Sequence, residues 1–289
     1  MPTLQEIKSR IRSVKSTRQI TKAMEMVAAA KLRRAQAGAT QARPYANSMS
    51  AMLKSLAEAS TGDISHPYFE EREIKKRTLV LVTSDKGLCG SFNTNLIRKA
   101  QHWLDQFSPS EVDLVLIGRR GADYFRRREF QIVANYHDWG GQLNYTTARQ
   151  IVAFLTGRFM AKETDSIHLI YPRFVSISVS KITNDTYLPI KKPAQESVQA
   201  GSAKQYIFEP GPKEIYSELM SSYVLTTMVT VLLDSFASEH GSRMIAMGAA
   251  TKNAGELIDN LSLTYNKARQ TKITTELLEI VSGAEALKA

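Results

Sequence analysis

The spacing of apolar residues at both ends of the chain predicts two long helices. From Lys213 to Ala289 there is no proline, and apolar residues recur at steps of three and four, as on one buried helical face. This track contains Val229, Leu233, Phe236, Met247, Ala250, Ala254, Leu257, Leu261 and Ala268. Such a helix would be roughly 115 Å long at 1.5 Å per residue. A compact domain does not need a helix of that length, so the pattern favours a mechanical or scaffolding role over catalysis.

The first 43 residues predict the second long helix. Thr3 and Glu6 have the spacing of a capping box at its start. We expect Pro44 to bend or interrupt the helix, which then resumes over Tyr45–Ala59. The apolar stripe begins with Leu4, Ile7, Ile11 and Val14, shifts its register before Ile20, and resumes with Met24, Val27 and Ala28.

Between the two helices the hydrophobic period changes to that of an α/β domain. Continuous apolar runs at 78–83, 112–118, 130–135 and 166–171 predict buried strands, and residues 91–107 and 144–161 predict helices between them. This alternation indicates βαβ units and a mainly parallel sheet. Residues 176–182 alternate between apolar and polar, which favours an antiparallel or edge strand.

These patterns divide the chain into four segments and define the fold class as α/β. We expect an N-terminal coiled-coil helix over 1–60 and a globular domain over 75–190. A loop-rich return over 191–212 and a C-terminal coiled-coil helix over 213–289 follow. The stripe of the C-terminal helix must be buried on the other end helix or inside a partner. The shorter N-terminal helix can cover only about half of it.

The distribution of charge is more informative than the overall composition. A content of 43% hydrophobic and 23% charged residues is ordinary for a folded protein. Of the net charge of +10, most lies in residues 1–43, which hold ten Lys and Arg against two Glu. A basic helix attracts nucleic acid, anionic lipid or carboxylates on a protein. The first aromatic residue is Tyr45, so the stacking surface of a nucleic-acid binder is missing from this helix.

Membrane insertion and disulfide chemistry are not predicted. The longest uncharged stretch, Leu219–Leu233, is shorter than the ~18–20 residues that a bilayer requires. Basic residues interrupt every apolar run near the N-terminus, unlike in a secretory signal. The single cysteine, Cys89, cannot form an intramolecular disulfide, and the five histidines have no metal-ligand spacing. We therefore expect no metal site.

One turn between a strand and a helix is the main candidate for chemistry. Ser84–Asn93 could cradle a phosphate on backbone N–H groups, but it lacks both the dinucleotide-binding and the P-loop glycine spacing. We interpret it as a structural turn and keep nucleotide binding as the alternative; its turn residues are Asp85, Gly87, Cys89 and Gly90. Cys89 has no recognisable histidine base, which argues against a nucleophile.

Two arginine groups, Arg119–Arg120 and Arg126–Arg128, are interpreted as a solvated helix face, with a phosphate or acidic contact as the alternative. No paired carboxylates suited to acid–base catalysis lie in a loop. The sequence therefore predicts no catalytic residues and no cofactor, and the chain is not expected to be an enzyme on its own.

Five segments, in order along nearly the whole chain, resemble the F-type ATP synthase gamma subunit family. They are Ile7–Gln36, Ser84–Gly90, Ser238–Met247, Tyr265–Gln270 and Ile273–Ala286. The resemblance implies an antiparallel coiled coil of the two end helices and a Rossmann-like domain. It also implies a rotor shaft in the central stalk that couples rotation of the c-ring to conformational change at the catalytic beta subunits. The implied partners are the alpha, beta and epsilon subunits and the c-ring, with no nucleic acid and no transmembrane insertion.

The resemblance also implies roles for individual residues. Lys22, Lys31, Arg33 and Arg34 would form a basic stripe facing acidic loops of beta. Arg269, Gln270 and Thr274 would form a polar catch with a beta loop. Met24 and Arg243 would make helix contacts, and Ile280, Val281, Ala284 and Leu287 would form an apolar bearing tip.

Location follows from two features that the sequence lacks. A transit peptide and the cysteine-bearing regulatory insertion of the chloroplast type are both missing, so we expect a bacterial protein that is peripheral to the cytoplasmic face of the cell membrane. Two alternatives remain open. One is a basic coiled-coil protein that binds nucleic acid, and the other is a Rossmann-type enzyme.

Overall fold

The computed structural model describes residues 3–59, 66–190 and 212–286, which form two compact units. The first unit consists of Met1–Ala28 and Met244–Ala289, and the second of Ala29–Arg243. Helices α1 (Leu4–Ala59) and α5 (Pro212–Ala286) contribute to both. Most of the predicted return over 191–212 lies outside the described residues, and the four-segment division remains a prediction.

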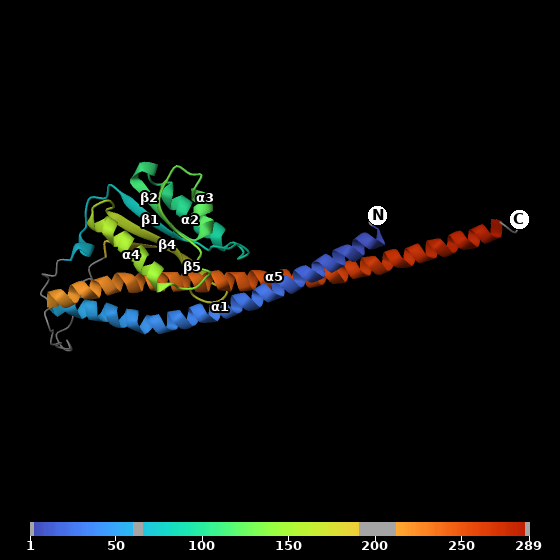
Figure 1. The fold of residues 1–289 in the computed structure, drawn as a ribbon, viewed down its shortest axis with the longest axis horizontal. Coiled ribbons are helices and arrows are strands. Elements are labelled where there is room, and N and C mark those ends of the chain that lie inside the picture. The colour runs from blue at the N-terminus through green and yellow to red at the C-terminus, as the bar shows by residue number, and fades with distance from the viewer. Residues whose placement is uncertain (1–2, 60–65, 191–211, 287–289) are drawn as a thin grey trace. The chain divides into compact units, whose positions relative to one another are not determined.

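The second unit contains a five-stranded sheet, shown in Figure 1. Its strands are β1 (Arg77–Val82), β2 (Val112–Ile117), β3 (Gln131–Tyr136), β4 (Ser166–Phe174) and β5 (Ser180–Leu188), in the order β3-β2-β1-β4-β5. The first four strands are parallel, and β5 pairs antiparallel to β4 at one edge. The predicted sheet type is therefore confirmed.

The edge strand begins later than the sequence pattern suggested. Residues 176–179 form the hairpin turn, in which the Val179 amide donates to the Ser176 carbonyl oxygen. The alternation from 176 to 182 thus runs across the turn and into the first residues of β5. A hairpin turn with alternating small polar and apolar residues cannot be separated from a strand by periodicity alone.

Helices cover both faces of the sheet (Figure 1). Right-handed crossovers place α2 (Phe92–Leu104) and α3 (Arg119–Phe125) on one face, and α4 (Tyr145–Met160) on the other. Short 3-10 turns lie at Pro67–Phe69 (η1) and Pro109–Glu111 (η2). The core between the sheet and these two helices contains wholly buried side chains from both layers. They include Leu79, Leu81, Leu96, Leu104, Leu114, Leu116 and Phe125.

The first unit is an antiparallel pair of helices. Glu25 of α1 faces Gly248 of α5, and the Thr251 hydroxyl contacts the Thr21 hydroxyl at 2.8 Å. Further along, Arg18 faces Gly255. Residue numbers fall along α1 as they rise along α5, which confirms the antiparallel coiled coil implied by the resemblance.

The buried face of this pair differs from the apolar stripe at several positions, and Val27, which the stripe included, is 57% exposed. Ile20 is 57% exposed, and Thr21 takes the buried position between Val14 and Met24. On α5 the predicted position Leu257 is 47% exposed, and Ile258 is buried instead. The helix steps by four residues after Ala254, so the assignment of Leu257 to the buried track was wrong.

Two predictions concern α1, a capping box at its start and a bend or interruption at Pro44. Thr3 and Glu6 form the capping box, since the Thr3 amide donates to Glu6 Oε2 at 2.8 Å and the Glu6 amide donates to Thr3 Oγ1. Of the expected bend or interruption at Pro44, the interruption is wrong, because α1 continues through Pro44 to Ala59. Proline removes one helical hydrogen bond without ending the helix here.

By length and hydropathy alone, α5 contains one stretch that qualifies as a membrane span. It lies within Glu218–Ala284, and 56% of its most apolar part is buried inside the protein. A test that counts only wholly uncharged stretches of sequence does not find this span. The buried share shows that many of these apolar side chains pack against the rest of the protein.

Candidate functional site

The turn Ser84–Gly90 lies at the carboxyl end of β1, next to β4, where the strand order reverses. In open α/β sheets this crevice is the usual place for a ligand. Here residues 238–243 of α5 contact both sides of the reversal. The Ser238 hydroxyl donates to the carbonyl oxygen of Pro172 on β4, and the Ser242 hydroxyl donates to that of Cys89 in the turn, at 2.7 Å.

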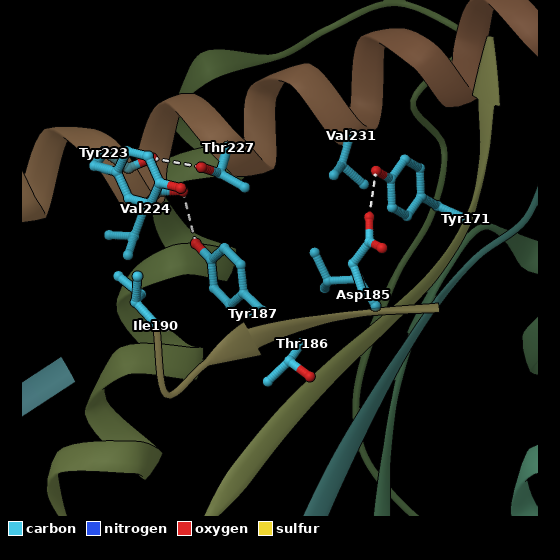
Figure 2. Close-up of a pocket in the computed structure, with 10 residues that line it drawn as sticks. Tyr171, Asp185, Thr186, Tyr187, Ile190, Tyr223, Val224, Thr227 and Val231 are labelled. Carbon is cyan, nitrogen blue, oxygen red and sulfur yellow. Dashed lines mark hydrogen bonds between the residues drawn. The ribbon is translucent and has the colours of Figure 1, made fainter. Parts of the chain in front are cut away.

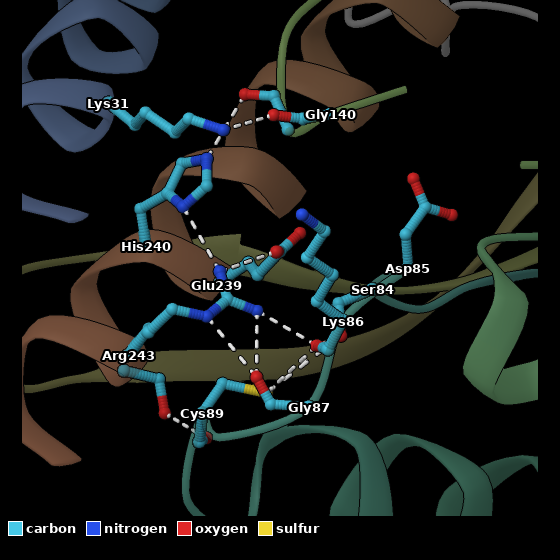
Figure 3. A network of polar contacts seen from close by, with 12 residues as sticks. Lys31, Ser84, Asp85, Lys86, Gly87, Cys89, Gly140, Glu239, His240 and Arg243 are labelled. Carbon is cyan, nitrogen blue, oxygen red and sulfur yellow. Dashed lines mark hydrogen bonds and ion pairs between the residues drawn. The ribbon is translucent and has the colours of Figure 1, made fainter. Parts of the chain in front are cut away.

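Arg243 makes the central contact with this turn (Figure 3). Its Nη2 donates to the carbonyl oxygens of Lys86, at 2.8 Å, and Gly87, at 3.2 Å, and its Nε also donates to Gly87. Its Nη1 pairs with Glu239 Oε1 at 2.7 Å. Both side chains are buried, so a guanidinium with matched acceptors fixes the turn to the helix.

This geometry is opposite to that of a phosphate site. A phosphate cradle needs backbone N–H groups directed at the ligand, whereas this turn directs the carbonyl oxygens of Lys86 and Gly87 at a cation of its own chain. The arrangement therefore favours the structural interpretation of the turn over nucleotide binding.

Within the turn, polar side chains surround the Cys89 thiol. Asn93 Nδ2 lies 3.3 Å from Cys89 Sγ and 2.8 Å from Ser84 Oγ, and Ser84 Oγ donates to the Lys86 carbonyl oxygen at 2.7 Å. Burial raises the pKa of the Cys89 thiol, and the Arg243 charge only partly opposes this. A buried thiol with a raised pKa is a poor nucleophile.

The other three predicted turn residues have specific geometric roles. Asp85 accepts hydrogen bonds from the amides of Trp139, at 2.8 Å, and Arg119, at 3.2 Å. A Cβ atom on Gly87 would lie 2.8 Å from Nη2 of Arg120, so the arginine side chain packs where a larger residue would be. Gly90 adopts a φ of +60°, which favours glycine.

His240 extends the network to a loop that follows β3 (Figure 3). Its Nδ1 accepts from Arg243 Nη1 at 3.2 Å, and its Nε2 donates to the Gly141 carbonyl oxygen at 3.1 Å. These partners require the neutral tautomer with hydrogen on Nε2. Burial is the main cause that lowers the pKa of His240 to about 4, and the charges of Arg243 and Lys31 add to it.

Both a basic and an acidic side chain, Lys31 and Glu239, lie in the network around His240. The Lys31 ammonium on α1 donates to the Gly140 carbonyl oxygen. Burial raises the pKa of Glu239, while its ion pair with Arg243 opposes the shift. The network can hold three segments together, but it contains no arrangement of nucleophile and base among the described residues.

A cavity lies between β5 and α5 in the same unit (Figure 2). It has a volume of about 220 Å³. Tyr187 donates its hydroxyl to the Val224 carbonyl oxygen at 2.7 Å on one side, and Tyr171 donates to Asp185 Oδ2 at 2.9 Å on the other. The first bond joins β5 to α5, and the second joins β4 to β5.

Comparison with known proteins identifies the family. The ATP synthase family model matches residues 3–287. Gamma chains of Chloroherpeton thalassium and Desulforamulus reducens are each 44% identical and are aligned over 100% of this chain and 99–100% of theirs. The chain belongs to the ATP synthase gamma chain family. Its fold is similar to a chain of the Tetrahymena thermophila mitochondrial ATP synthase central stalk and c-ring, with a TM-score of 0.62, 25% identity, and coverage of 80% of this chain and 99% of that one. A Euglena gracilis mitochondrial ATP synthase chain has a TM-score of 0.66, 18% identity, and coverage of 98% and 94%.

The basic stripe expected for a gamma chain divides into two groups. Arg33 and Arg34 are exposed on α1, as is Lys22, whose ammonium lies 3.2 Å from Glu25. Lys31 differs, because it is half-buried and holds Gly140. The stripe as a surface for a partner remains a prediction, and Lys31 contributes an internal contact instead of a free charge. Met24 is half-buried in the helix pair.

The C-terminal residues expected to contact partners of a gamma chain are exposed. Arg269, Gln270 and Thr274 all face solvent, and Thr274 Oγ1 donates to the Gln270 carbonyl oxygen of its own helix. Ile280 and Val281 are 68% and 60% exposed. Leu287 lies outside the described residues, whereas Ala284 is exposed. Their roles as catch and bearing remain predictions.

Sequence reasoning missed Glu239, His240 and the loop ending at Gly141. Glu239 and Arg243 have the i,i+4 spacing of an ion pair, which could have been noticed. The contact between His240 and Gly141 joins residues 99 positions apart, so no local sequence pattern predicts it.

Proposed function

We propose that the chain is the central-stalk rotor shaft of a proton-translocating F-type ATP synthase. In this role it couples rotation of the c-ring to conformational change at the catalytic beta subunits. The main support for this proposal is the similarity to gamma chains over the full length of both aligned sequences. The chain is a non-catalytic subunit, and its partners are the alpha, beta and epsilon subunits and the c-ring.

The helix pair supports a mechanical role. In the antiparallel register Thr21 faces Thr251 and Arg18 faces Gly255, so the first residues of α1 reach only about as far as residue 270 of α5. Every residue from 269 to 284 is exposed. A helix end that carries Leu277, Ile280 and Val281 in water is unfavourable, so a surrounding sleeve of partner subunits accounts for it.

Two kinds of contact are proposed along this exposed end. Arg269, Gln270 and Thr274 offer directional hydrogen bonds that depend on the rotation angle, which suits a catch on a beta loop. The apolar tip with Ile280, Val281, Ala284 and Leu287 offers dispersion contacts with little angular preference, which suits a bearing. The exposed basic residues Lys22, Arg33 and Arg34 would meet acidic loops of beta.

Location follows from assembly. As part of a membrane-associated synthase, the chain is peripheral to the membrane. We propose the cytoplasmic face of a bacterial cell membrane, because the similar gamma chains come from bacteria.

Affinity purification from native membranes tests the proposal. A tagged chain should recover the alpha, beta and epsilon subunits and the c-ring in fixed proportions. The purified chain alone should hydrolyse no ATP, and assembly with alpha and beta should produce hydrolysis that rotates it. Turnover by the chain alone that disappears when one of its own residues is changed would contradict the rotor function.

A further inference from the structure

The loop between β3 and α4 is fixed on three sides by residues from three other elements. The Trp139 amide donates to Asp85 Oδ2 at 2.8 Å, in the turn after β1. Lys31 of α1 donates to the Gly140 carbonyl oxygen, and His240 of α5 donates to the Gly141 carbonyl oxygen at 3.1 Å. One short loop thus contacts the turn after β1 and both long helices within the second unit.

Two adjacent glycines show how closely this loop fits. Both Gly140 and Gly141 have positive φ values, +60° and +71°. A Cβ atom on Gly141 would lie only 2.3 Å from Nε2 of His240, whereas a Cβ on Gly140 would meet nothing within 4 Å. The backbone conformation favours glycine at both positions, but only Gly141 is also required by the contact with the helix.

The charges around His240 make the contact specific to its neutral form. Arg243 and Lys31 are the cations, Glu239 is the nearby acid on the same helix, and Asp85 faces Glu239 from the turn. A neutral imidazole can accept from Arg243 and donate to Gly141 at the same time. His240 therefore links the loop contact to the hydrogen bonds that hold the turn after β1.

We infer that Lys31, His240 and the loop Asp138–Gly141 form a clasp that adds to the torsional stiffness between the sheet and the two helices. This inference rests on the proposed rotor function, in which torque must pass between these parts. Turning the helices against the sheet would break either the Lys31–Gly140 or the His240–Gly141 contact. Because the clasp grips both helices through adjacent carbonyl groups, it resists rotation in either direction.

Single-molecule rotation of the assembled complex tests the clasp. A probe on Lys99→Cys in exposed α2, in a Cys89→Ser background, reports the angle of the sheet while the catalytic subunits are stalled with a non-hydrolysable nucleotide. Gly141→Ala should widen the variance of this angle, because it removes one of the contacts that join the sheet to α5, while those of Ser238, Ser242 and Arg243 remain. Gly140→Ala, with the same kind of backbone strain and no collision, is the matched control and should leave the variance unchanged.

The histidine variants separate positioning from simple packing. His240→Ala should widen the variance as Gly141→Ala does, and His240→Gln, which keeps a donor and an acceptor, should restore much of the stiffness. If Gly141→Ala does not assemble, Lys31→Met tests the same clasp from α1. Rotation with an unchanged variance in Gly141→Ala or Lys31→Met would overturn the clasp alone. Failure of the unaltered chain to rotate in an assembled complex would instead overturn the rotor function.

Discussion

Arg243 Nη2 lies 2.8 Å from the carbonyl oxygen of Lys86, so a side chain of the C-terminal helix occupies the inner side of the turn after the first strand. In doubly wound folds this place commonly receives the phosphate of a ligand. Here the same crevice receives a guanidinium and is closed by it. A fold associated with ligand binding is thereby used to attach a sheet to a long helix.

Replacing Arg243 should destabilise the second unit. Arg243→Lys keeps the charge but cannot reach Glu239 and two carbonyl oxygens together, and should lower the free energy of unfolding by about 2 kcal/mol. Arg243→Ala leaves Glu239 buried without its partner and should cost about 3–5 kcal/mol. Urea denaturation of the full chain measures both. The exposed pair Lys252–Glu256 supplies the control Lys252→Ala, which should change the midpoint little. Equal midpoints for Arg243→Ala and the control would show that the buried pair does not stabilise the unit.

The Cys89 thiol should be unreactive and dispensable. Burial raises its pKa, so alkylation by iodoacetamide at pH 8 should be slow in the folded chain and fast after denaturation. Cys89→Ser should keep ATP synthesis by the assembled complex within a few-fold of normal, because a hydroxyl can still accept from Asn93. Complete loss of synthesis in a fully assembled complex would assign the sulfur a role that the geometry does not indicate.

His240 should make stability depend on pH below neutrality. Its pKa is about 4 in the folded chain, against an ordinary value of 6.5. The unfolded state therefore binds more protons between these values, so the stabilisation is complete above pH 6.5 and is lost as the pH falls towards 4. The full loss from this group is on the order of 3 kcal/mol.

Denaturation of wild type and His240→Gln between pH 7 and pH 4 measures this contribution. The variant should lose less stability over the range. Some pH dependence will persist, because burial also lowers the pKa of His168 to about 4. Parallel curves for the two proteins would show that His240 is already protonated in the fold, or equally exposed in both states.

The sequence predicted most of the elements because their signals are local. The apolar runs at β1 and β2, and the alternation with helices, follow from which side chains can be buried on both faces of a sheet. The capping box of Thr3 and Glu6 depends on residues only three positions apart. Such features are decided within one turn or one strand, where a single sequence contains enough information.

The remaining features depend on contacts that the hydrophobic pattern does not encode. Thr21 occupies a buried position because Thr251 offers it a hydrogen bond across the helix pair, so a stripe of apolar residues seemed to shift there. Similarly, His240 is a core histidine whose partners come from α5 and a distant loop. Polar side chains in a core are identified only by their partners, and these are set by tertiary structure.

The pair Thr21–Thr251 should show strong coupling in a double-mutant cycle. Thr251 donates to Thr21, which in turn donates to the Arg18 carbonyl oxygen. Thr251→Val alone should lower the free energy of unfolding by about 1 kcal/mol. The hydroxyl oxygen of Thr21 then loses its hydrogen-bond donor and faces an apolar side chain. The double variant with valine at both positions should be nearly neutral or more stable, since a buried apolar pair replaces the polar one. Amide hydrogen exchange along both helices measures the stability of the single and double variants. Strictly additive effects would show that the two threonines are not coupled.

The proposed catch and bearing can be told apart by comparing two changes near the end of α5. Arg269→Ala with Gln270→Ala removes charge-assisted hydrogen bonds worth about 1.5–3 kcal/mol each, so coupled ATP synthesis and steady-state hydrolysis should both fall ten-fold or more. Truncation after Ser282 removes only contacts with little angular preference and should do less.

Lys272→Ala is a matched control, because Lys272 is exposed on the same helix and pairs with Glu276 of that helix, at 3.6 Å. Its complexes should behave as wild type, and all variants need equal subunit content, because poor assembly would imitate a loss of function. A silent double variant together with a truncation that abolishes rotation would reverse the two assignments: torque would then depend on the apolar tip, and the polar residues would only face solvent.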